Sequence, residues 1–77
     1  MVQFKQWLIH NKGLSDRSSN DVISRLKRVC KILNRSEISS DTVSALNQSS
    51  NFKALSTSVK SQLRRSIKLY EEYLSEK

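Results

Sequence analysis

The sequence predicts an all-α protein: a compact bundle of four to five helices, two of them long and the others short connecting helices. Two long stretches carry apolar residues at steps of three and four, as the buried side of a helix requires, and no stretch alternates like a strand. The chain has one glycine and no proline, so few positions interrupt a helix. Its 77 residues are enough for one domain, residues 1–77.

The first predicted helix spans residues 2–11 and ends close to the only glycine of the chain. Phe4, Trp7 and Leu8 lie at i, i+3 and i+4 and form its apolar face. Gly13 can adopt a positive φ without strain, which makes it the C-terminal stop. A helix this short needs a partner helix to cover its apolar face.

The second predicted helix spans residues 16–34 and carries the strongest helical signal. Ser15 is a favourable N-cap, and Asp16 places a negative charge in the positive first turn. Four residues form its core stripe at steps of four, three and four: Val22, Leu26, Val29 and Leu33. The chain therefore stops one helix and starts another within three residues.

A short third helix is predicted at residues 41–47, after a polar segment. Ser39, Ser40 or Asp41 can serve as its N-cap. The polar composition of residues 47–51 then predicts a loop.

The last predicted helix spans residues 57–75 and is capped by Ser56 or Ser58. Just before it, Phe52 and Leu55 are expected to be the apolar anchors of a single turn. Its apolar stripe reaches almost to the end of the chain and comprises Val59, Leu63, Ile67, Tyr70 and Leu74.

The charge balance favours a polyanionic partner. Fourteen Lys and Arg residues against seven Asp and Glu give a formal net charge of +7. Such an excess promotes binding to nucleic acid through the release of counterions. No apolar run is long enough to cross a membrane, and a single cysteine excludes an internal disulfide, so we expect a cytoplasmic protein without a membrane partner.

The residue groups of an enzyme or a metal site are absent from the sequence. His10 is the only histidine, and the acidic residues show no spacing typical of acid–base chemistry or metal binding. We therefore expect no catalysis, cofactor, metal, small-molecule substrate or deep pocket in so small a domain. Cys30 lies in an apolar stripe and is expected to pack as a small hydrophobe, and Tyr73 is the one aromatic residue expected to be partly exposed.

Basic residues gather on both long helices. A helical wheel of residues 16–34 places most of them opposite the apolar stripe and Arg25 at its boundary. On the last helix, Lys60, Arg64 and Lys68 form a ridge at i, i+4 and i+8, with Arg65 further round. The basic faces could simply be solvated, and the serines at the helix starts could simply cap the helices. Alternatively, the basic residues and these serines could together contact phosphates. The candidate nucleic-acid-binding residues are Arg17, Ser19, Arg25, Arg28, Lys31, Ser58, Lys60, Arg64 and Arg65.

Several short patterns of the chain occur together in one known family. They are Phe4, Trp7-Leu8, Gly13-Leu14-Ser15, Ser18 or Ser19 before Leu26 and Leu33, and Leu55 to Val59 followed by Gln62 to Tyr70. The chain thereby resembles the N-terminal SAM-like, or core-binding, domain of phage integrases and other tyrosine recombinases. The resemblance implies a four- or five-helix bundle on one side of duplex DNA, with catalysis in a separate C-terminal domain of the parent protein.

Two functions follow as alternatives. The first is a non-catalytic DNA-binding module that serves DNA recombination or integration and contacts the duplex through the basic faces of the second and last long helices. The second is a small helical interaction module, an adaptor or inhibitor, that binds an acidic protein surface. A bundle with basic faces suits both, because the fold alone does not decide function.

Overall fold

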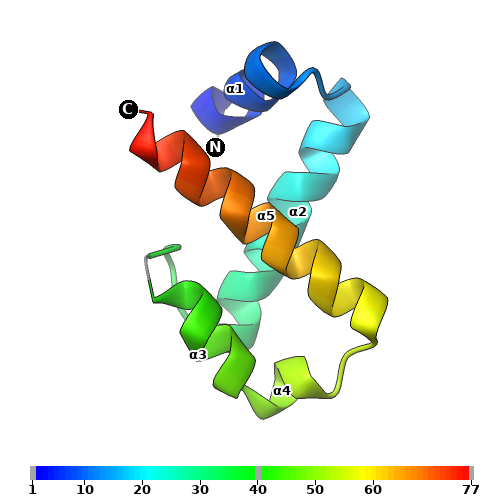
Figure 1. Cartoon of the computed structure of the whole chain (residues 1–77), viewed down its shortest axis with the longest axis vertical. Coiled ribbons are helices and arrows are strands. Elements are labelled where there is room, and N and C mark those ends of the chain that lie inside the picture. The colour runs from blue at the N-terminus through cyan, green and yellow to red at the C-terminus, as the bar shows by residue number, and fades with distance from the viewer. Residues whose placement is uncertain (1, 40, 77) are drawn as a thin grey trace.

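Five helices build the chain in the computed structural model, which describes residues 2–39 and 41–76. They are α1 (Val2–Lys12), α2 (Asp16–Leu33), α3 (Thr42–Gln48), α4 (Ser50–Lys53) and α5 (Thr57–Ser75). The described residues contain no strand, which confirms the all-α prediction. The long helices α2 and α5 cross near their middles, α1 covers the C-terminal half of α5, and α3 and α4 lie at the other end of the bundle (Figure 1).

The junction between α1 and α2 has the predicted geometry. Gly13 takes φ 66°, and the Leu14 N–H donates to the Leu8 carbonyl at 3.3 Å. The Ser15 hydroxyl then accepts from the Ser18 N–H at 3.1 Å, which makes Ser15 the N-cap of α2. A free carbonyl at the end of α1 and a free N–H at the start of α2 thus both gain hydrogen bonds within a few residues.

The end of α2 is one residue earlier than predicted. Asn34 leaves the helix with φ 55°, a left-handed conformation that asparagine tolerates better than most residues. The Arg35 N–H donates back to the Cys30 carbonyl at 2.9 Å and closes the turn. Asn34 is therefore the C-cap and not the last helical residue.

The segment between α3 and α5 differs from the prediction, because residues 47–51 do not form a loop. Helix α3 continues to Gln48, and only Ser49 is extended before α4 begins. The Ser49 hydroxyl accepts from the Phe52 N–H at 3.4 Å, so a serine expected in a loop caps a new helical turn. That turn buries Phe52, as predicted. Of the proposed α3 caps, Asp41 holds the N-cap position without a side-chain cap bond, and Ser40 lies outside the described residues.

The core forms where the apolar stripes of α2 and α5 face each other. Its buried residues come from all five helices and are Phe4, Leu8, Val22, Leu26, Val29, Leu46, Phe52, Leu63, Ile67 and Tyr73. Leu33, Val59 and Tyr70 pack at its edge and are half-buried. The predicted stripes therefore supply most of the core.

Two assignments near the end of α5 are wrong. Tyr73 is 8% exposed rather than partly exposed, whereas Leu74 is 41% exposed rather than part of the stripe. The reason is the position of α1, which covers the Tyr73 side of α5. The Tyr73 ring lies 5.2 Å from the ring of Phe4 and 5.6 Å from that of Trp7, and such aromatic contacts bury large areas.

Candidate nucleic-acid interface

Most of the positive charge is not neutralised inside the molecule. Among the residues described, three cations form ion pairs: Lys5 with Asp16, Lys12 with Glu72 and Arg35 with Asp41. Within the described part of the chain, the following cations have no ion pair, hydrogen bond or ring contact: Arg17, Arg25, Lys27, Arg28, Lys31, Lys53, Arg65 and Lys68. The charge excess is therefore displayed on the surface.

A long stretch of the chain, from Thr42 to Tyr70, contains five Lys and Arg residues and neither Asp nor Glu. It forms α3, α4 and the first three quarters of α5. This asymmetry is a sequence signal for a basic surface, and it adds Lys53 to the candidate residues named above. The acids Glu71, Glu72 and Glu76 follow only at the C-terminal end of α5. Glu72 pairs with Lys12 of α1 and Glu76 accepts from Trp7 Nε1, whereas Glu71 lies beside Ile38 and Ser39.

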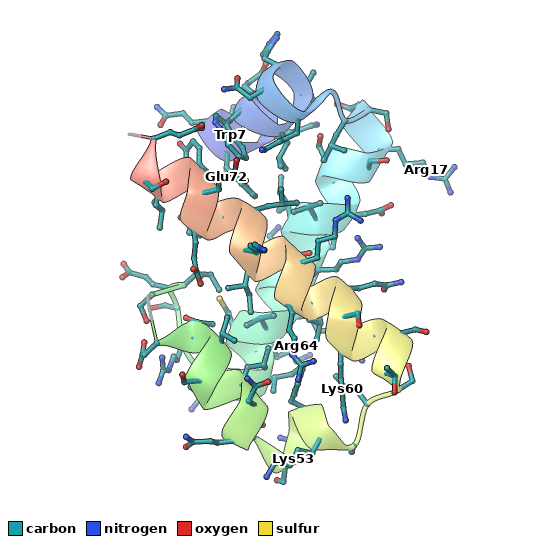
Figure 2. All side chains as sticks on the ribbon, viewed as in Figure 1. Trp7, Arg17, Lys53, Lys60, Arg64 and Glu72 are labelled. Carbon is teal, nitrogen blue, oxygen red and sulfur yellow. The ribbon has the colours of Figure 1, made fainter. Side chains whose placement is uncertain are left out.

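Two basic residues contact the buried ring of Phe52, and Lys53 follows that residue in the chain. The three basic residues Lys53, Lys60 and Arg64 are called the Phe52 cluster. The Lys60 ammonium lies 6.0 Å from the ring centroid, and the Arg64 guanidinium carbon lies 5.2 Å from it. In Figure 2, Lys60 and Arg64 point from α5 toward α4, where Lys53 lies. Two cations thus share one aromatic ring, which attracts both through its quadrupole while they repel each other.

Asn47 at the end of α3 fixes the orientation of Arg64. The Asn47 Oδ1 accepts from Arg64 Nε at 3.2 Å and from Nη2 at 2.8 Å. This pair of bonds and the Phe52 ring leave Nη1 free to donate to an external acceptor. A guanidinium held in this way loses less side-chain entropy when it binds phosphate.

A groove runs between α2 and α5 on the other flank of α5. Its volume is about 440 Å³. Arg25 of α2 and Arg65 of α5 line it together, so the structure brings these two predicted residues to one place.

The remaining basic residues of α2 do not share a surface with those of α5. Because α5 packs on the apolar stripe of α2, residues on the opposite side of α2 point away from α5. Lys31, Arg28 and Arg17 lie on that side, and Figure 2 shows Arg17 pointing into solvent away from the body of the bundle. The basic faces of the two long helices therefore form two surfaces rather than one.

The two predicted serines have different environments. Ser58 is exposed in the first turn of α5, next to the Ser56 hydroxyl that accepts from the Val59 N–H at 3.3 Å. Ser19 has no exposed surface, and its hydroxyl has no hydrogen-bond partner among the described residues. The prediction that Ser19 contacts nucleic acid is wrong, because Ser19 lies on the buried side of α2, about one turn before Val22.

Titratable groups elsewhere do not form a chemical site. The described residues include no group of three or more His, Cys, Asp or Glu side chains that could hold a metal ion. His10 shares a hydrogen bond with Gln6, and burial raises the pKa of the Cys30 thiol. The Ser39 hydroxyl, and then Arg35, lower the pKa of Asp41, a surface effect at the start of α3.

Comparisons with known proteins add no family to this description. No protein-family model, no curated protein and no solved structure matches the chain. None of the helices, over the residues described, is both long enough and apolar enough to cross a membrane.

Proposed function

We propose that the chain is a non-catalytic, cytoplasmic DNA-binding module, whose main contact with duplex DNA is the outward face of α5. The observation that carries the proposal is the acid-free stretch from Thr42 to Tyr70, which places four cations on α5 without any ion pair: Lys60, Arg64, Arg65 and Lys68. Phosphate contacts by such residues supply most of the affinity of non-specific DNA binding.

The shape of α5 supports the same proposal. A helix with its side chains is about 10–12 Å across, and the major groove of B-DNA is about 12 Å wide. Between Thr57 and Lys68 the exposed side of α5 carries small and polar side chains, including Ser58, Ser61 and Gln62. No large apolar side chain there would obstruct the approach of a phosphate backbone.

The resemblance to the core-binding domain of tyrosine recombinases supports a role next to a separate catalytic domain in the parent protein. Within that resemblance, α5, the last long helix, is the main DNA contact. Arg25 extends the α5 surface across the groove, and Lys53 extends it on the side of α4. Arg17, Arg28 and Lys31 belong to the opposite surface.

Fluorescence anisotropy with a labelled duplex, measured at several salt concentrations, tests the proposal. Four phosphate contacts give a slope of about −3.6 in a plot of log K against log salt, so affinity falls about 150-fold between about 50 and 200 mM salt. The double variant Arg65→Gln/Lys68→Gln is expected to reduce the slope to about −1.8.

The matched control is Arg28→Gln/Lys31→Gln, which removes one Arg and one Lys at the same i, i+3 spacing on the opposite face. This control is expected to retain most of the affinity and the slope. Equal losses in the two double variants would refute α5 as the main contact. Absence of duplex binding at about 50 mM salt would refute DNA binding altogether and favour an acidic protein partner.

A further inference from the structure

The groove between α2 and α5 has the size and wall of a ligand site. Each long helix contributes residues at i, i+3, i+4 and i+7, which lie on one helical face: Ser18, Asp21, Val22 and Arg25 from α2, and Gln62, Arg65, Ser66 and Leu69 from α5. Lys12 and Leu14 close the end next to α1. The volume of about 440 Å³ is within the range of small-molecule sites.

Two arginines of the wall have no partner of opposite charge. Arg25 is half-buried, and it forms no ion pair with Asp21 although the i, i+4 spacing on α2 would permit one. Arg65 faces the same groove from α5 and is also unpaired. Guanidinium groups bind phosphate strongly, because several N–H groups donate to its oxygens at once, and the half-buried Arg25 is also partly desolvated.

The rest of the wall selects among anions. Leu14, Val22 and Leu69 supply an apolar floor that inorganic phosphate could not use. Asp21 has no ion-pair partner in the described structure, and its carboxylate can accept a hydrogen bond from a hydroxyl group of a ligand. A suitable ligand therefore combines a phosphate, hydroxyl groups and a flat apolar body.

We propose that this groove binds a mononucleotide, with its phosphate between Arg25 and Arg65, its base on the apolar floor and its sugar near Asp21. The nucleotide is either free or the phosphorylated end of a strand, since both present the same groups. The inference goes beyond duplex binding, because Lys60, Arg64 and Lys68 can contact a phosphate backbone without the groove, although Arg65 belongs to both surfaces.

Titration of the isotope-labelled protein with AMP, followed by amide NMR shifts, tests the inference without any duplex. We expect saturable shifts at Leu14, Val22 and Leu69. Adenosine and inorganic phosphate are each expected to bind about tenfold more weakly than AMP, because each lacks one half of the recognised groups. No saturable shift at about 10 mM AMP, or equal affinity for inorganic phosphate, would overturn the inference.

The variants Arg25→Gln and Arg28→Gln form a matched pair, because both remove one arginine from α2 but only Arg25 lines the groove. The first is expected to weaken AMP binding about tenfold or more, and the second to leave it unchanged. Equal weakening would mean diffuse attraction and overturn the site. A duplex with phosphorylated ends that competes with AMP more strongly than the same duplex with hydroxyl ends identifies the strand end as the source. Equal competition by the two duplexes identifies the free nucleotide.

Failure of this inference and failure of DNA binding are distinguishable. Saturable AMP binding in a protein that does not bind a duplex would refute only the proposed function. Salt-dependent duplex binding without a response to AMP would refute only the nucleotide site.

Discussion

Replacing Ser19 by alanine is expected to stabilise the protein, which is unusual for a fully buried position. The Ser19 hydroxyl is buried in the core without a hydrogen-bond partner among the described residues. Ser66 is the natural control, because it is also a buried helical serine but its hydroxyl donates to the Gln62 carbonyl at 3.0 Å. Replacement by alanine removes a buried hydroxyl at both positions, but only the Ser66 hydroxyl forms a hydrogen bond.

The magnitude follows from that difference. Burying a hydroxyl without a partner costs about 1–3 kcal/mol, and alanine favours a helix over serine by a few tenths of a kcal/mol. Ser19→Ala is therefore expected to raise the free energy of unfolding by about 1–2 kcal/mol. Ser66→Ala gains the same helix propensity but loses a bond worth about 1 kcal/mol, so its net change is about zero or slightly unfavourable.

Thermal unfolding followed by circular dichroism measures the difference. For a domain of this size, 1 kcal/mol shifts Tm by about 4–8 °C, so Ser19→Ala should unfold clearly above the parent and above Ser66→Ala. A Ser19→Ala protein that unfolds at or below the parent temperature would refute the reasoning. Weaker duplex binding by that stabilised variant would show that Ser19 reaches the nucleic acid after all.

Three further predictions concern a turn, the Phe52 cluster and an acidic surface group. Gly13→Ala is expected to lower the free energy of unfolding by about 1–2 kcal/mol in denaturant titrations, because alanine is strained at positive φ while its Cβ would meet no atom. Gly13→Asn should lower the free energy of unfolding by less. Equal losses in the two variants would contradict this account. Asn47→Ala is expected to weaken duplex binding about two- to tenfold in anisotropy without changing the slope of log K against log salt, because Arg64 keeps its charge but loses its orientation. Arg64→Gln should instead reduce the magnitude of that slope by about 0.9. The contacts that lower the pKa of Asp41 stabilise the fold at pH values above the unfolded-state pKa, and this stabilisation is lost as the pH falls through the folded-state pKa. Asp41→Asn should therefore make stability depend less steeply on pH below about pH 4. Identical acid-unfolding curves for the two proteins would contradict the contact.

The boundaries of the helices were predictable because local groups set them. Ser15 and Ser56 cap the two long helices with their own hydroxyls, and Gly13 ends α1 through its backbone conformation. The single turn at Phe52 was also predictable from its apolar anchors. The loop expected at residues 47–51 was wrong, because composition alone does not reveal that Ser49 would cap a new turn.

The candidate site was only partly predictable, for a geometric reason. A helical wheel assigns each side chain to a face of its own helix, but it does not say how two helices are oriented relative to each other. The predicted nucleic-acid-binding set combined Arg28 and Lys31 of the second helix with Arg64 of the last helix, although the crossing of α2 and α5 places them on opposite surfaces. The burial of Ser19 and the meeting of Arg25 with Arg65 in one groove depend on the same crossing.

The sequence by itself determined the helical class, the caps, most of the core stripe and the excess of positive charge. Each of these depends on residues at most a few positions apart, or on composition. Only the tertiary structure decided that Tyr73 is buried, that Leu74 is exposed and that Asn47 orients Arg64. These outcomes depend on which helix covers which side of α5, and the contacts responsible join residues far apart in the chain.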